Sequence, residues 1–141
     1  MIEFINETQV AVDDTIFEGI YNYLTTQDLE CLIVDANAMK VINAQTRSID
    51  KPTDVLSFPL QDNPSSTMLG TIVICLDIAL EYATTLGHTL EEELQLLFIH
   101  GLLHLLGFDH EVDNGQMRLE EEKLIHHFKL PHSLLIRNQE S

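Results

Sequence analysis

The sequence predicts a single α+β domain over residues 1–141, in which helices pack against a small mixed β-sheet. Two observations predict this class. Apolar patterns with the periods of strands and helices alternate along the first half of the chain, and three helical patterns follow one another in the second half. The 141 residues, 45% of them hydrophobic, suit one core, and no repeat, low-complexity block or Pro/Gly/Ser-rich linker divides them.

The first half of the chain is predicted to alternate strands with helices. The N-terminal residues alternate apolar and polar side chains, as an edge strand does. A continuous apolar run is typical of a strand covered on both faces, and an aspartate before each helical stripe can cap it. The predicted order is a strand at 1–6, a helix from Asp13 or Asp14 to Leu24, a strand at 31–34, and a helix from Asp35 or Asn37 that ends before Arg47, with Ala38, Val41 and Ile42 inward.

The second half is predicted to contain two strands and then three helices. Pro59 indicates an edge strand or a bulge, because proline cannot donate to a β-ladder. Gly87 and Gly107 are expected to end two successive helices, and Thr89 and Glu92 have the spacing of a capping box between them. The predicted order is a strand at 54–60, a turn at 61–67, a strand at 69–75, a helix capped by Asp77 that ends at Leu86, a long helix that ends at Gly107, and a last helix at 114–128 with Met117, Leu124 and Phe128 inward.

The chain is strongly acidic, with 7 Lys/Arg, 23 Asp/Glu and a formal net charge of −16. Such a field repels phosphate, which excludes binding to nucleic acid or an anionic membrane by overall charge alone. The glutamate triplets 91–93 and 120–122 are predicted to be solvated helix faces. Cys31 and Cys75 lie in apolar runs and are expected to be buried, reduced thiols. With no signal-peptide pattern at the N-terminus, they predict a cytoplasmic protein.

Three histidines in FIHGLLHLLGFDHE carry the predicted chemistry. His100 and His104 are four residues apart on the long helix, so their imidazoles project from one face. Gly107 ends this helix, and His110 can then return toward the same face. Three neutral imidazoles suit Zn²⁺, and three protein ligands leave a fourth position for water, as in catalytic zinc sites. We therefore predict one zinc ion per chain at the end of the long helix.

Two other interpretations of these histidines are open. They can be separate histidines, one in the core and two on the surface, although burying imidazoles among leucines is costly unless each is hydrogen-bonded. The spacing HxxxHxxGxxH is also that of metzincin proteases, but Gly101 stands where their general-base glutamate would be. Asp109 is the nearest carboxylate and can orient a ligand histidine; His88, at a helix start, is a candidate for the same role.

The segment from His100 to Glu111 resembles the signature of the YbeY family of bacterial rRNA maturation factors and endoribonucleases. Further blocks agree with that family in the same order along residues 42–111, which is half of the chain. They are Ile42-Asn43 followed by Arg47, KPTDVLSFP at 51–59, Gly70 with the apolar run 72–74, and Gly87-His88.

The resemblance implies a zincin-like fold and a zinc ion bound by His100, His104 and His110. It also implies hydrolysis of single-stranded RNA in rRNA maturation, including small-subunit rRNA end processing and ribosome quality control. The arginine that matches Arg47 is expected to be essential, and a guanidinium can clamp a phosphate with two hydrogen bonds.

The expected partners are single-stranded rRNA and either the small ribosomal subunit or ribosome-biogenesis proteins, with no membrane and no DNA. RNA is expected to enter beside Arg47, because Lys40, Arg47 and Lys51 form the only basic-leaning segment. A non-catalytic, metal-containing ribosome assembly factor stays open as an alternative, as does a metalloprotease-like hydrolase, with less support.

Overall fold

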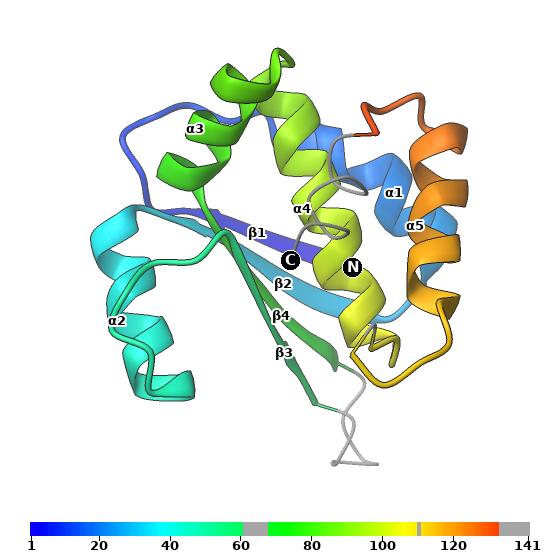
Figure 1. Cartoon of the computed structure of the whole chain (residues 1–141), viewed down its shortest axis with the longest axis horizontal. Helices are drawn as coiled ribbons and strands as arrows, with labels where there is room; N and C mark the ends of the chain where they lie inside the picture. Colours follow the sequence, from blue (N-terminus) through cyan, green and yellow to red (C-terminus); the bar gives the residue numbers. More distant parts are fainter. Residues whose placement is uncertain (61–67, 110, 133–141) are drawn as a thin grey trace.

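Four strands form a mixed sheet in the computed structural model, which describes residues 1–60, 68–109 and 111–132 (Figure 1). The strands lie in the order β1-β2-β4-β3. β1, β2 and β4 run parallel, as expected for strands joined through helices, and β3 pairs antiparallel with β4 at the edge. The predicted α+β class, mixed sheet and edge position of Pro59 are confirmed. The strands are β1 (Ile2–Asn6), β2 (Asp28–Val34), β3 (Val55–Pro59) and β4 (Met68–Cys75).

The helices begin and end largely at the predicted signals. Asp13 and Asp35 accept hydrogen bonds from the backbone of the turns they cap. The capping box of Thr89 and Glu92 is present, and Gly87 ends its helix in the left-handed conformation at φ 77°. The helices are η1 (Asp14–Phe17), a 3-10 turn that leads into α1 (Glu18–Leu24), then α2 (Ala36–Arg47), α3 (Leu76–Leu86), α4 (Leu90–Leu105) and α5 (Gln116–His127).

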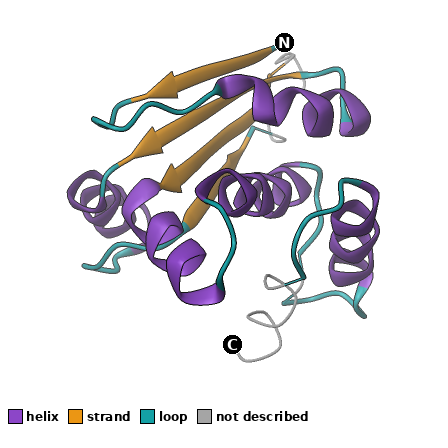
Figure 2. Ribbon diagram, turned by 90° about the horizontal axis from the view of Figure 1, so that it is seen from above, coloured by secondary structure: helices purple, strands orange, loops and turns teal. Residues whose placement is uncertain are grey.

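Helices cover both faces of the sheet. In β2, Cys31 and Ile33 belong to the large core under α1, α4 and α5, whereas Leu32 and Val34 pack in a smaller cluster with α2. This confirms the prediction of a strand covered on both faces. α4 lies between α3 and α5 (Figure 2) and also contacts β3 and β4. The predicted histidine helix is therefore central to the fold.

Two details of the predicted helices are wrong. Val41 is 54% exposed, and the buried residues of α2 are Met39 and Asn43. Asp77 does not cap α3; its carboxylate accepts the Ala36 N–H at 2.6 Å, at the start of α2. The reason is that β2 and β4 are adjacent parallel strands, so the residues after both strands meet at the same edge of the sheet.

The last helix, predicted from about residue 114, begins at Gln116, and Asp113 accepts the Met117 N–H in its first turn. The predicted turn at 61–67 lies outside the described residues.

The two cysteines are buried and unbridged, as predicted. Burial raises the pKa of the Cys31 and Cys75 thiols above the ordinary value, which keeps both in the unreactive protonated form. Within the described residues, none of the helices combines the length and the apolar character that a membrane crossing requires.

Candidate functional site

The last turns of α4 place two predicted ligands side by side. The rings of His100 and His104 are edge to face, with centroids 4.8 Å apart, because residues four apart share one helical face. Gly107 follows the helix at φ 99°, and its N–H donates to the His104 carbonyl, which turns the chain at the predicted point. The spacing argument is therefore confirmed for the two histidines on the helix.

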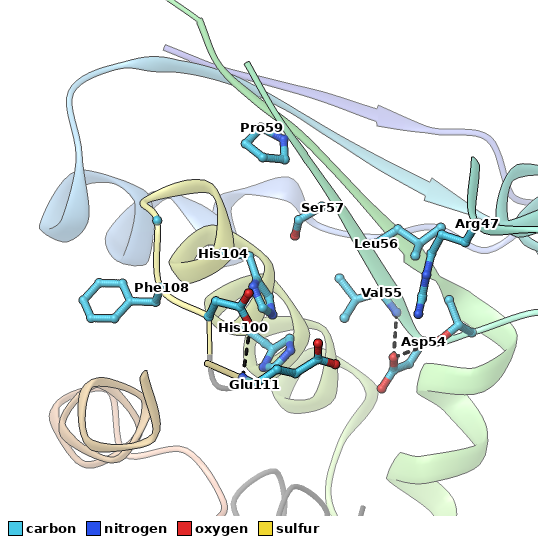
Figure 3. A pocket seen from close by; sticks show the side chains of 13 residues that line it. Arg47, Asp54, Val55, Leu56, Ser57, Pro59, His100, His104, Phe108 and Glu111 are labelled. Carbon is cyan, nitrogen blue, oxygen red and sulfur yellow. Dashed lines mark hydrogen bonds between the residues drawn. The ribbon is translucent and has the colours of Figure 1, made fainter. Parts of the chain in front are cut away.

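The two histidines line a surface hollow of about 530 Å³ (Figure 3). Its walls come from the end of α2, from β3 with the residues before it, and from α4 with the turn that follows. The arginine predicted from the sequence lies across the hollow from the two rings. The lining residues are Arg47, Thr53, Asp54, Val55, Leu56, Ser57, Pro59, His100, His104, Gly107, Phe108, Asp109 and Glu111.

His100 is held by a buried carboxylate that the sequence analysis did not single out. Nδ1 of His100 lies 2.6 Å from Oε1 of Glu121 on α5, and the Glu121 side chain is 1% exposed. The triplet 120–122 is therefore not simply a solvated face. The burial of Glu121 could have been predicted from its position in the sequence. It lies on the same helical face as Met117 and Leu124, which the sequence predicts to point inward.

His88 forms a second pair of the same kind, away from the hollow lining. Its Nε2 lies 2.7 Å from Oε1 of Glu93, and the two side chains are 5% and 0% exposed. Glu93 was also expected to be solvated, and that expectation is wrong. His88 is not among the described residues that line the hollow; its pair with Glu93 lies at the junction of α3 and α4.

Asp109 shapes the turn after α4. Its carboxylate accepts the Glu111 N–H at 3.0 Å, and its carbonyl accepts the N–H groups of Val112 and Asp113. These bonds fix the backbone on the far side of His110, which itself lies outside the described residues. Glu121 thus bonds to a predicted ligand, whereas Asp109 bonds to the backbone of residues 111–113.

Gly101 explains why this helix departs from the protease pattern. Ser57 Oγ donates to the Gly101 carbonyl at 2.9 Å, so α4 lies directly against β3. A Cβ at residue 101 would be 2.8 Å from Ile72 Cγ2 and 3.2 Å from Ser57 Oγ. A glutamate at this position would require the Ile72 side chain or the helix itself to shift.

The hollow is suited to a cation. Among its described lining residues, Arg47 is the one cationic side chain that is charged at every pH of interest, against the carboxyl groups of Asp54, Asp109 and Glu111. A carboxylate bonded to Nδ1 favours the tautomer whose lone pair is on Nε2, the arrangement usual for zinc-binding histidines. The imidazoles of His100 and His104 are donors that suit zinc. Within residues 1–60, 68–109 and 111–132, no group of three or more His, Cys, Asp or Glu side chains is placed to hold a metal ion. A third imidazole is predicted at His110.

Comparisons with known proteins agree with the resemblance noted in the sequence. The model of the family described as Endoribonuclease YbeY matches residues 4–129. A protein named Endoribonuclease YbeY from Aliarcobacter butzleri is 51% identical over 98% of this chain and 99% of its own, and one from Campylobacter jejuni is 54% identical over 87% and 91%. The solution structure of a Thermotoga maritima protein superimposes with a TM-score of 0.60 at 30% identity, covering 87% of this chain and 85% of that one.

Proposed function

The chain belongs to the YbeY family of endoribonucleases, and from this premise we propose that it is a zinc-dependent enzyme that cleaves single-stranded RNA in rRNA maturation. The proposal includes end processing of small-subunit rRNA and a part in ribosome quality control. Its substrate would be a flexible single strand, because the hollow is open to the surface and is lined from three separate segments of the chain.

One observation carries the proposal: two imidazoles and a guanidinium line one hollow whose other charged groups are carboxylates. The three carboxyl groups of this lining outnumber the single guanidinium, so a phosphodiester needs a further cation there to offset them. The two histidines are the groups that would recruit zinc, His100 with its Nε2 lone pair favoured by the carboxylate on Nδ1, and Arg47 is the group that would recruit phosphate.

We assign His100, His104 and His110 as the ligands of one zinc ion. When bound, zinc supplies Lewis acidity: it stabilises negative charge on a phosphoryl oxygen and makes water more acidic. Glu121 orients the His100 ring through the bond to Nδ1, and Asp109 fixes the backbone at Glu111. In this assignment, both carboxylates act by holding groups of the protein in place before substrate arrives.

Arg47 is assigned to the phosphate. It is the last residue of α2, and Ser48 follows in the left-handed conformation at φ 59°, so the chain leaves the helix sharply and the arginine borders the hollow. Its planar, permanently charged guanidinium can donate two parallel hydrogen bonds to phosphoryl oxygens and offset the charge that develops there during cleavage.

The acidic surface bears on the choice of partner. Glu91 and Glu122 remain exposed, whereas Glu93 and Glu121 are buried in histidine pairs. We propose that the exposed carboxylates meet a basic surface of the small ribosomal subunit or of a ribosome-biogenesis protein.

Membership in an endoribonuclease family favours an RNA-cleaving enzyme over a non-catalytic ribosome assembly factor.

The deciding experiment is cleavage of a defined, unstructured RNA by zinc-loaded protein, with products resolved by gel electrophoresis. His104→Ala is the inactive control, because it removes a ligand from the exposed end of α4. Cleavage by wild type and not by His104→Ala would support the proposal. Equal cleavage by both, or by neither at high enzyme concentration, would contradict it.

A further inference from the structure

We propose that a second hollow, which adjoins the histidine hollow, binds the nucleotide that flanks the scissile phosphate of RNA. This inference rests on the proposed function, because it assigns a place to the next unit of the same substrate. The second hollow is about 420 Å³ and shares Arg47, Thr53 and Asp54 with the first. Its full lining is Asn43, Arg47, Ile49, Lys51, Pro52, Thr53, Asp54, Ile78 and Tyr82.

Charge distinguishes the two hollows. Arg47 and Lys51 face one carboxylate, Asp54, in the lining of the second hollow. That carboxylate already accepts the Val55 N–H at 2.8 Å. In the described lining of the second hollow, the Lys and Arg side chains outnumber the carboxylates, whereas in the first hollow the carboxylates outnumber the single arginine. A strand that leaves the histidines past Arg47 therefore meets favourable charge for its next phosphate here.

The remaining wall suits a base. Ile78 and Tyr82 are one turn apart on α3, and Ile49 and Pro52 contribute further apolar surface to the same hollow. Proteins that bind single-stranded nucleic acid use an aromatic ring beside a cation, because every base has a face that can stack. A phosphate-binding ammonium next to a tyrosine and apolar side chains thus favours a nucleotide over a bare anion.

The hollow is held open by bonds within the protein. Asn43 is 1% exposed, and its side-chain Nδ2 donates to the Lys51 backbone carbonyl at 2.8 Å. The backbone carbonyl of Asn43 accepts the Ile49 N–H at 3.4 Å. On the other side, the Asp54 carbonyl accepts the Cys75 N–H at 2.9 Å. Segment 48–54 is therefore fixed to α2 and to β4, and the site needs little ordering when RNA binds.

Binding of two labelled oligomers to zinc-loaded protein tests the proposal by fluorescence anisotropy. One is a single-stranded 2′-O-methyl hexanucleotide, and the other is an abasic hexamer with the same backbone charge. Wild type should prefer the oligomer with bases by about tenfold. Tyr82→Leu should remove most of this preference and Tyr82→Phe should retain it, because the phenylalanine keeps the ring.

Lys51→Ala should weaken binding of both oligomers and reduce the slope of log affinity against log salt by about one. The matched control is Lys40→Ala, since Lys40 lies on α2 near the same loop, pairs with Asp50 at 3.9 Å and lines neither hollow. A base preference that survives Tyr82→Leu, or binding of neither oligomer by wild type, would overturn the inference. Because the measurement needs no cleavage, this result is separate from a failure of the nuclease assay.

Discussion

Replacement of Glu121 by glutamine is predicted to weaken zinc binding with only a modest loss of stability. The substitution keeps the side-chain volume and one acceptor oxygen, but removes the negative charge 2.6 Å from His100 Nδ1. The affected bond is buried, since the two side chains are 1% and 14% exposed. The bond joins α5 to α4, and Glu121 is not among the residues that line the hollow.

The magnitude follows from the kind of bond that is lost. A hydrogen bond to a charged group contributes about 1.5–3 kcal/mol and a neutral one about 1 kcal/mol, so the free energy of unfolding should fall by about 0.5–2 kcal/mol. For a domain of this size, that lowers Tm by up to about 8 °C. Loss of the carboxylate partner of a ligand imidazole typically reduces metal affinity by about 10- to 100-fold.

The assay measures zinc affinity by competition with a chromophoric chelator, alongside Tm and the visible spectrum of the cobalt-substituted protein. Glu93→Gln is a matched control, because Glu93 is equally buried and bonds to a histidine ring nitrogen at a similar distance, 2.7 Å from His88 Nε2. It should lower Tm by a similar amount and leave zinc affinity and the cobalt spectrum unchanged. Equal zinc affinity in Glu121→Gln and wild type, or equal weakening by both variants, would refute the reasoning.

Four further results are expected. Arg47→Ala should keep zinc content and Tm yet cleave RNA about 100-fold more slowly, and Arg47→Lys should restore little because an ammonium cannot make the forked contact. A His100→Ala/His104→Ala protein should hold almost no zinc by elemental analysis. Gly101→Ala should lower Tm although alanine favours helices by about 1 kcal/mol, since its Cβ would meet Ile72 at 2.8 Å. Binding of wild type to free RNA should show a salt slope of about −1 to −3, and a slope of −5 or steeper would contradict the charge argument.

The parts of the site that local sequence determines were predictable. His100 and His104 share a face because of helical period alone, and Gly107 and the Thr89 capping box act within a few residues of the helix ends. The burial of Glu121 was not predicted, because a run of three glutamates is usually solvated and its histidine partner lies on another helix. Glu93 was misjudged because it also belongs to a run of three glutamates, although its partner His88 lies only five residues before it.

The tertiary contacts also explain why two distant sequence blocks belong to one site. Arg47 ends α2, and segment 48–54 leads directly into β3, whose Ser57 bonds to the backbone of α4 at Gly101. The absence of a side chain at Gly101 lets α4 approach β3, and this brings His100 and His104 to the hollow that Arg47 borders. The glycine that removes the protease base thus also helps bring a guanidinium within the same hollow as the imidazoles. One close helix–sheet contact accounts both for the departure from the protease pattern and for a site that combines metal ligands with a phosphate-binding group.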